Sequence, residues 1–267
     1  MKKEDLSILF ERTLACDYDD DGAWEAVNAL RSQGGREVFG RAAQWLKSAR
    51  PLERARAADI LGQIGVGPGR AHESPTEACE LLIELLLGEQ HPRAAASALV
   101  ALGHIQDSRA LPVIYRFIGN EDPVLRHAVA FALGCFVQDT ASHPGLMLLM
   151  SDSDEDVRDW ATFSLGVWGD LDSARVRDAL ARRLDDSFEN VRLEAIAGLA
   201  KRHDARVLPL LIEALEWPEA QDDPEPKLIE AACALLSLSK EPRGWVGEDY
   251  ARALRQRFRG EIAPSWQ

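Results

Sequence analysis

One short apolar signature recurs seven times along this chain, and each copy ends in Leu-Gly or a close substitute. The spacings between its reference leucines are 31, 41, 31, 32, 34 and 36 residues. The leucines are Leu30, Leu61, Leu102, Leu133, Leu165, Leu199 and Leu235. Such a period means that one supersecondary unit is repeated along the chain. The sequence therefore predicts a solenoid whose stacked units share a continuous core.

The fifth copy shows the unit most clearly. It runs from Asp152 through Val157, Ala161 and Leu165 to Gly166. Offsets of 0, +4 and +8 from Val157 place small and branched apolar residues on one face of an α-helix. The small residue at +4 lets a neighbouring helix approach closely. We expect the glycine at +9 to end the helix in a left-handed cap.

Another amphipathic stretch precedes each signature helix, and most of the connecting turns carry Asp, Asn, Pro, Ser or Gly. Examples of these stretches are 76–87, 110–118, 174–184 and 206–215. No alternation of Val, Ile and Thr suggests a strand. We predict an all-α superhelix (α-solenoid) of about seven helical hairpins that forms a single domain over residues 1–267. Its expected parts are an N-terminal cap helix within 1–20, repeats over 21–236 and a C-terminal cap over 237–267.

A polar pattern recurs at the turns. An Asp or Asn stands five residues before the apolar position, and an Arg follows that position directly. The residues are Asn120 with Arg126, Asp152 with Arg158, and Asp186 with Arg192. We predict a structural ladder in which each acid caps a helix start and pairs with an arginine of its own or the next repeat. The alternative is that these arginines grip a phosphate of a ligand.

These repeated residues resemble the HEAT repeat, in the short bacterial form shared with phycobilisome lyase subunits, over about 21–236. A closer resemblance, to an enterobacterial family of HEAT proteins, rests on 156–161, 191–196 and 228–232. That family has no established enzymatic activity to carry over, and its genes tend to lie near polymorphic-toxin loci. The resemblance therefore implies binding to, or neutralisation of, another protein.

The charge is strongly and unevenly acidic. The formal net charge is −13, and residues 151–225 hold 19 acids against 9 Lys and Arg. Many of these acids fall in turns, which stack on one edge of a solenoid. A negative edge attracts a basic protein partner and repels nucleic acid, so we expect no nucleic-acid partner. The alternative is that the acids keep the chain soluble and favour helix starts.

The helix face beside the packing face is a candidate binding surface. Offsets +2, +3 and +6 of the central signature helices should point into a concave groove, where Trp160 replaces the Glu common at +3. The predicted partner-binding residues are Arg126, His127, Phe131, Asp159, Trp160, Phe163 and Glu194. Because Trp and Arg dominate interface energetics, we predict a non-catalytic scaffold or adaptor anchored at Trp160. A regulatory or toxin-neutralising role is its specific form. The alternative is that Trp160 and Phe163 fill a seam between repeats.

A HEAT-like enzyme or enzyme subunit is the competing hypothesis. A di-iron hydroxylase would need repeated His-Glu pairs, and only His72 among six histidines is followed by Glu. Asp159 and Trp160 superficially fit a DNA glycosylase, but the acidic block opposes DNA binding. Nothing identifies a chromophore site for a bilin lyase. We predict no catalytic residue, metal or cofactor.

The remaining features concern compartment and irregular segments. Four scattered cysteines, no signal peptide and no long apolar run predict a cytoplasmic chain with reduced thiols and no membrane partner. A Gly/Pro-rich insertion at 65–75 is either a flexible spacer or a partner contact, and 217–226 breaks the repeat a second time. A basic helix near 248–258 should cap the C-terminal end, and the alternative is that it binds a partner. Trp245 and Trp266 leave the oligomeric state open.

Overall fold

The computed structural model describes residues 5–15, 17–217 and 225–260. Within these ranges every regular element is helical, apart from an isolated bridge between Gly67 and Arg70. The predicted all-α architecture of stacked hairpins is confirmed. The chain forms two compact units, residues 1–145 and 146–267. The expectation of a single domain stays a prediction.

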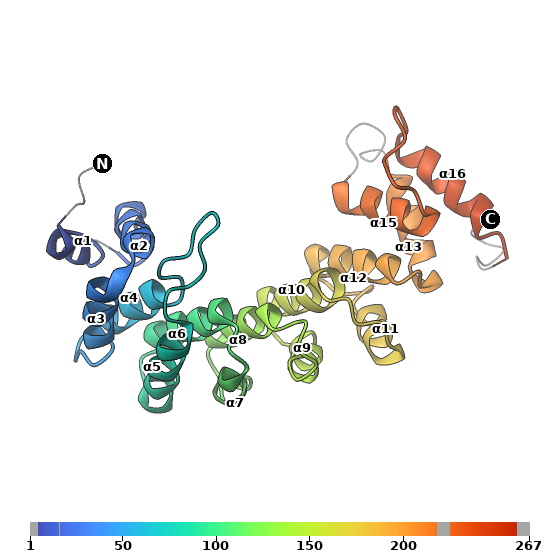
Figure 1. Ribbon diagram of the computed structural model, residues 1–267. Helices are drawn as coiled ribbons and strands as arrows, with labels where there is room; N and C mark the ends of the chain where they lie inside the picture. The colour runs from blue at the N-terminus through green and yellow to red at the C-terminus, as the bar shows by residue number, and fades with distance from the viewer. Residues whose placement is uncertain (1–4, 16, 218–224, 261–267) are drawn as a thin grey trace. The chain divides into compact units, whose positions relative to one another are not determined.

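The first unit contains four hairpins. Their signature helices are α2 (Asp21–Gln33), α4 (Pro51–Leu61), α6 (Pro92–Ile105) and α8 (Pro123–Cys135). Their first helices are α1 (Leu6–Arg12), α3 (Gly35–Trp45), α5 (Pro75–Gly88) and α7 (Leu111–Tyr115), the last preceded by the 3₁₀ turn η1 (Ser108–Ala110). The signature helices pack on one another in chain order, and each first helix packs on its own signature helix (Figure 1).

The second unit continues the same plan after α9 (His143–Leu149), which crosses the boundary. Its signature helices are α10 (Glu155–Phe163) with the π-helical segment η2 (Ser164–Trp168), α12 (Glu189–Lys201) and α15 (Pro226–Leu236). Its first helices are α11 (Ala174–Ala181) and α13 (Leu208–Leu215), the latter preceded by η3 (Ala205–Val207). The C-terminal helix α16 (Gly247–Arg257) packs on α13 and α15, where a cap helix was predicted.

The apolar period fixes the buried face of each signature helix. In α10 and η2, Val157, Ala161 and Leu165 are fully buried. The equivalent offsets in α12 are buried in the same way. Apolar side chains every three to four residues form one stripe, and burying that stripe stabilises the helix more than its intrinsic propensity does.

The glycines at +9 act differently from the prediction, and the predicted left-handed cap was wrong. Gly62 is right-handed, with φ −62°. A Cβ built on Gly62 would lie 2.8 Å from the Cα of Ala101, and one on Gly103 would lie 2.9 Å from the Cα of Ala132. These positions carry no side chain because the next signature helix passes directly against them.

The turn residues of the predicted ladder do not cap the helices, which corrects a second expectation. The capping side chains of α8 and α10 belong to Asp122 and Asp154. The ladder residues stand two positions before the N-cap, and each side-chain oxygen accepts a hydrogen bond from the backbone N–H of the N-cap residue. The acceptors are Asn120, Asp152 and Asp186, at 2.9, 2.9 and 3.1 Å. They therefore shape the turn that leads into each helix.

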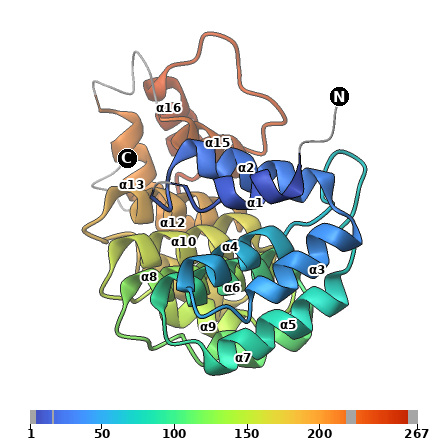
Figure 2. The same ribbon diagram turned by 90° about the vertical axis from the view of Figure 1, so that its left-hand side faces the viewer.

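The insertion at 65–75 stands out from the helices (Figure 2) but is fixed near its C-terminal end. The His72 Nε2 lies 2.6 Å from the carbonyl oxygen of Leu61, and the Glu73 carboxylate accepts a hydrogen bond from the Gly35 N–H at 2.6 Å. Of the two original alternatives, a spacer that is free along its whole length does not fit these bonds. Partner contact by the exposed tip stays a prediction.

Two further observations concern compartment and thiols. No helix within the described ranges is long and apolar enough to cross a membrane. Cys79, Cys135 and Cys233 are free thiols, and Cys79 is buried. Cys16, most of the second irregular segment (218–224) and Trp266 lie outside the described residues.

Candidate functional site

The turn edge carries a repeated arginine motif. In four hairpins the arginine one residue after the apolar position donates from Nη1 to the backbone carbonyl six residues earlier. The pairs are Arg54 with Ser48, Arg126 with Asn120, Arg158 with Asp152 and Arg192 with Asp186, at 2.8, 2.9, 2.9 and 2.7 Å. Each arginine thus closes the turn of its own hairpin.

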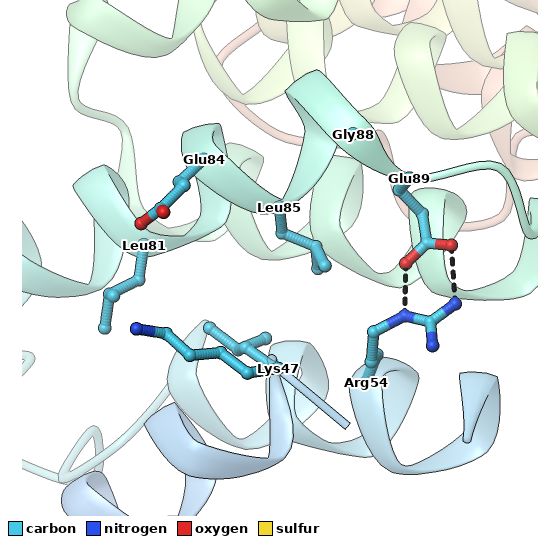
Figure 3. A pocket seen from close by; sticks show the side chains of 8 residues that line it. Lys47, Arg54, Leu81, Glu84, Leu85, Gly88 and Glu89 are labelled. Carbon is cyan, nitrogen blue, oxygen red and sulfur yellow. Dashed lines mark hydrogen bonds and ion pairs between the residues drawn. The ribbon is translucent and has the colours of Figure 1, made fainter. Parts of the chain in front are cut away.

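The same arginine also joins neighbouring hairpins. Arg158 forms two hydrogen bonds with the carboxylate of Asp186, at 2.9 and 3.0 Å. Arg54 binds Glu89 in the same bidentate way, at 2.6 and 2.8 Å (Figure 3). Burial raises the pKa of Asp186, but the hydrogen bonds from Arg158 and a backbone N–H outweigh it, so the pKa ends below its usual value. The guanidinium groups of Arg54 and Arg158 are therefore bound to acceptors within the protein, which favours the structural ladder over a phosphate grip.

The ladder has a gap between the third and fourth hairpins. Ala95 stands where the arginine would be, and the turn residue of the next hairpin is the neutral Asn120. A cavity of about 270 Å³ lies at this place, and Ala95, Asn120 and Arg116 line it. Because the third hairpin supplies no arginine, a carboxylate at position 120 would lack the partner that Asp186 has.

The signature face of the first unit contains a cavity of about 380 Å³. It lies over α2, α4, α6 and α8, and residues at the +2, +3 and +6 offsets contribute much of its lining. Its aromatic, basic and imidazole groups are Tyr18, Trp24, Arg31, Arg93, His104 and His127. This cavity is referred to below as the N-terminal pocket.

A buried polar network supports the N-terminal pocket. The Tyr18 hydroxyl donates to the carboxylate of Asp59 at 2.8 Å and lies 2.9 Å from the Ser97 hydroxyl. Arg56 is fully buried, donates to the Tyr18 carbonyl at 2.6 Å, and has a nitrogen 3.6 Å from Asp59. Burial raises the pKa of Asp59, and burial and Asp59 together raise that of Tyr18. The network fastens the segment around Tyr18 to α4.

The signature face of the second unit combines aromatic rings with carboxylates. The rings of Trp160, Phe163 and Trp168 have centroids 4.8 to 5.8 Å apart, and Trp168 is 44% exposed. These three rings, with Asp159 and Glu194, are called the aromatic–acidic face. This face joins residues of α10 and η2 to a carboxylate of α12.

The two carboxylates of the aromatic–acidic face are incompletely satisfied. Glu194 is 4% exposed, and its Oε1 accepts a hydrogen bond from Lys227 at 2.5 Å. Its Oε2 and the Oδ1 of Asp159 are buried, and neither has a hydrogen-bond partner among the described residues. Burial is the larger cause and the negative charge of Glu194 the next, and together they raise the pKa of Asp159 to about 6. The face therefore presents two carboxylate oxygens that could accept donors.

The predicted partner-binding residues separate into three places. Asp159, Trp160, Phe163 and Glu194 share the aromatic–acidic face. His127 lines the N-terminal pocket, and Phe131 packs edge-on against His104 with ring centroids 5.1 Å apart. The guanidinium of Arg126 instead lies at the turn edge, where its own hairpin turn supplies two carbonyl acceptors.

Several residues of these surfaces were not predicted from the sequence. In the second unit they are Trp168 and Lys227; in the first they are Tyr18, Trp24, Arg31 and Arg93. One signal was present in the sequence, because Trp24 occupies offset +2 of the first copy. Tyr18 gave none, since it belongs to a loop between α1 and α2.

Known proteins share the helical repeats described above. The sequence pattern of HEAT repeats matches residues 79–166 and 143–237, more than half of the chain. The chain belongs to the HEAT-repeat family. As a HEAT-repeat protein it is similar to Protein YibA of Escherichia coli K12, with 28% identity over 225 residues, covering 80% of this chain and 76% of YibA. The resemblance to an enterobacterial HEAT protein is confirmed.

Solved structures show the same fold. The X-ray structure of YibA matches with a TM-score of 0.73 and 24% identity, covering 96% of this chain and 94% of that one. An engineered protein matches with a TM-score of 0.54 and 18% identity, covering 96% of this chain and 72% of its own. Both are similar to this HEAT-repeat protein in the course of the backbone.

Metal-ligating residue types are dispersed in this HEAT-repeat protein. The part of the chain that the structure describes contains no group of three or more His, Cys, Asp or Glu side chains placed to hold a metal ion. The one His-Glu pair, His72 and Glu73, binds backbone groups of neighbouring turns.

Proposed function

We propose that this HEAT-repeat protein is a non-catalytic binding module that holds a basic protein partner on its aromatic–acidic face. A partner arginine would lie between Asp159 and Glu194 and stack beside Trp160. The observation that carries the proposal is the pair of buried carboxylate oxygens, one on each acid, that no described residue hydrogen-bonds.

Leaving these oxygens unsatisfied has an energetic cost. A buried acceptor without a partner costs about 1–3 kcal/mol, and more when it is charged. The mutual repulsion of Asp159 and Glu194 adds to that cost, since it contributes to the raised pKa of Asp159. Lys227 already offsets part of both penalties, and a second cation between the two acids would offset the remainder. When a ligand supplies the missing donors, the penalty for these unsatisfied oxygens is removed, and this gain strengthens binding of the ligand.

An arginine fits this place better than other basic groups do. Its planar guanidinium offers five N–H donors, which can satisfy two carboxylates at once. It also stacks on aromatic rings, and Trp is the best acceptor of such cation–π contact. The exposed ring of Trp168 and the half-buried ring of Trp160 belong to the same helical segment as Asp159, and Glu194 comes from α12.

The seam-filling alternative explains only part of this arrangement. It accounts for the partial burial of Trp160 and Phe163, whose rings pack together. It does not account for the exposure of Trp168 or for the unsatisfied oxygen atoms of Asp159 and Glu194. The acidic block around the face would also increase the association rate of a basic partner.

The test is affinity capture from native lysate with the wild type and a Trp160→Ala, Asp159→Lys double variant, read by mass spectrometry. Asp185→Lys is the matched control, because Asp185 is an exposed acid of the same block. We expect a basic protein that the wild type and the control retain and the double variant loses. Equal capture by all three folded proteins would overturn the proposal.

A toxin-neutralising role is the specific form of this proposal. It predicts that the captured protein is toxic on its own and is inhibited by the wild type at stoichiometric concentration. The double variant should fail to inhibit it, while Asp185→Lys should inhibit it fully. Co-expression with growth as the readout measures this directly.

A further inference from the structure

The N-terminal pocket holds two guanidinium groups, those of Arg31 and Arg93, against one carboxylate, that of Asp59. Arg93 is exposed, and its one described contact is with the Tyr18 ring, 4.3 Å from the ring centroid. Arg31 donates from Nε to the backbone carbonyl of Asp59 at 2.9 Å and from Nη1 to Asn28 at 3.2 Å. Within the described ranges no carboxylate lies at ion-pair distance from Arg31 or Arg93. In a chain of net charge −13, two such arginines in one cavity are a notable local excess.

Asp59, the acid among the residues that line the pocket, shares its charge between Arg31 and the buried Arg56. Asp59 is 6% exposed, and its carboxylate accepts the Tyr18 hydroxyl and faces the buried Arg56. It cannot turn towards Arg93 without leaving Arg56 uncompensated, which is costly for a buried charge. The mouth of the pocket therefore keeps a local positive charge.

The walls of the N-terminal pocket favour an apolar body attached to the anion. Tyr18 and Trp24 contribute aromatic rings, packed edge to face with centroids 5.6 Å apart. Val100 and Val124 also line the pocket, and Val124 is 53% exposed. A cavity of about 380 Å³ is at the lower end of the range for small-ligand sites.

We infer that the N-terminal pocket binds a carboxylate carried on an aromatic or apolar body, with Arg93 and Arg31 as its donors and Trp24 and Tyr18 as its walls. The carboxylate belongs either to a free aryl or acyl acid or to the C-terminus of a polypeptide. This site is separate from the one proposed for a basic partner, because it has the opposite charge and lies in the other unit.

A monoanion suits the pocket better than a phosphate. Asp59 stands at its floor and the whole chain is acidic, so a second negative charge on the ligand would be repelled. Desolvation and the charge of Arg31 lower the pKa of His104, so this imidazole adds no positive charge at neutral pH. The pocket lining consists of side chains, without the glycine-rich backbone cradle that phosphates commonly use.

The test monitors the signal of the Trp24 indole N–H in nitrogen-15 NMR spectra. This signal is identified by its loss in the variant Trp24→Phe. The wild type is titrated with N-acetyl-L-phenylalanine, with the corresponding primary amide and with inorganic phosphate. We expect saturable shifts with the acid, and at least about tenfold weaker binding of the amide, since a charge-assisted hydrogen bond contributes ~1.5 kcal/mol or more. An amide that binds as well as the acid, or a phosphate that binds more tightly, would overturn the inference.

Variants of the arginines complete the test. Arg93→Gln should weaken binding of the acid about tenfold without changing the thermal melt, because Arg93 is exposed. Arg175→Gln, another exposed arginine without a described partner, should leave binding unchanged. A pentapeptide ending in Phe distinguishes the two sources: equal affinity to the single residue supports a free acid, and a gain of about tenfold supports a polypeptide C-terminus. Unchanged binding in Arg93→Gln would contradict the assignment.

Discussion

The turn edge and the signature faces use the same two groups, guanidinium and carboxylate, in opposite ways. On the edge, Arg158 and Asp186 bind each other, and their side chains are 11% and 5% exposed. On the faces, Asp159 and Glu194 each keep a buried oxygen without a described partner, and Arg93 forms no ion pair with a carboxylate of the described residues. The edge groups are satisfied within the fold, whereas we propose that the face groups meet their partners on another molecule.

One helical repeat generates both situations. Positions −5 and +1 fall at the turn, where neighbouring hairpins come together and can exchange charges. Positions +2, +3 and +6 fall on a second face, which is buried in α4, at Ala55, Arg56 and Asp59, and half-buried in α10, at Asp159, Trp160 and Phe163. The stack therefore needs its paired charges on the edge, whereas the burial of the second face differs from one hairpin to the next. Three experiments test this division, beginning with the one of largest expected effect.

Removing an edge carboxylate should cost the most stability. Asp186→Ala takes away the acceptor of Arg158, Arg183 and the Phe188 N–H, and leaves Arg158 uncompensated. We expect a loss of about 3 kcal/mol in the free energy of unfolding, measured by urea denaturation at pH 7. Asp172→Ala is the control, because the Asp172–Arg177 pair is far more exposed and should cost under about 1 kcal/mol.

The pH dependence gives the same experiment a second readout. The folded pKa of Asp186 is below its unfolded value of about 3.9, so its contribution is present above that pH and is lost as the pH falls through the folded pKa. Asp186→Ala should therefore lose less stability on acidification than the wild type does. A variant as stable as the wild type would contradict the structural role of the edge.

Neutralising a face carboxylate should instead stabilise the protein. The pKa of Asp159 is about 6 in the folded state and about 3.9 in the unfolded state. Between these two pH values the folded state therefore binds more protons at Asp159 than the unfolded state does. The contribution of Asp159 to wild-type stability should become unfavourable as the pH rises from about 4 to about 6, and this penalty is full above that range. We expect Asp159→Asn to gain roughly 1 kcal/mol at pH 7.5 and less at pH 4.5, a value reduced for partial solvent exposure.

The measurement for Asp159→Asn is urea denaturation at both pH values, beside capture of the basic partner. Asp185→Asn, an exposed acid, should change neither. Gained stability together with lost binding is the signature of a functional site that the fold maintains at a cost. Unchanged stability at pH 7.5 would show that Asp159 is already satisfied.

The sequence alone predicted the parts of the molecule that the repeat controls. The offsets of Val157, Ala161 and Leu165 identify the buried face because helix geometry relates spacing to direction. The role of Gly62 was misjudged, since the sequence shows the missing side chain but not the helix that passes against it. Arg54 was overlooked because Glu53 occupies its apolar reference position.

The candidate sites were less predictable than the fold, because they depend on contacts between distant residues. Tyr18 reaches Asp59 and Ser97 across 41 and 79 positions of sequence. No periodicity marks a loop tyrosine or the excess of positive charge around Arg93. Trp160 was recognisable because the repeat pattern sets an expected residue at offset +3, and Trp160 departs from it.

Completing the gap in the ladder should have the smallest effect. Ala95→Arg with Asn120→Asp would recreate the pair that Arg54 and Glu89 form one hairpin earlier, in a cavity of about 270 Å³. The new carboxylate could still accept the Asp122 N–H that Asn120 accepts now. We expect a favourable coupling energy of about 0.5–1 kcal/mol in a double-mutant cycle measured by urea denaturation.

The single variants decide whether that coupling comes from the ladder. Asn120→Asp alone places a carboxylate at the turn without the arginine from position 95, and Ala95→Arg alone places a guanidinium near Arg116. Each should therefore be neutral or slightly destabilising, so that the gain appears only in combination. Strictly additive effects would mean that an Arg at +1 and an acid at −5 of the next hairpin are not sufficient to form a ladder ion pair. The geometry of each hairpin junction would then decide which charged side chains can form a pair.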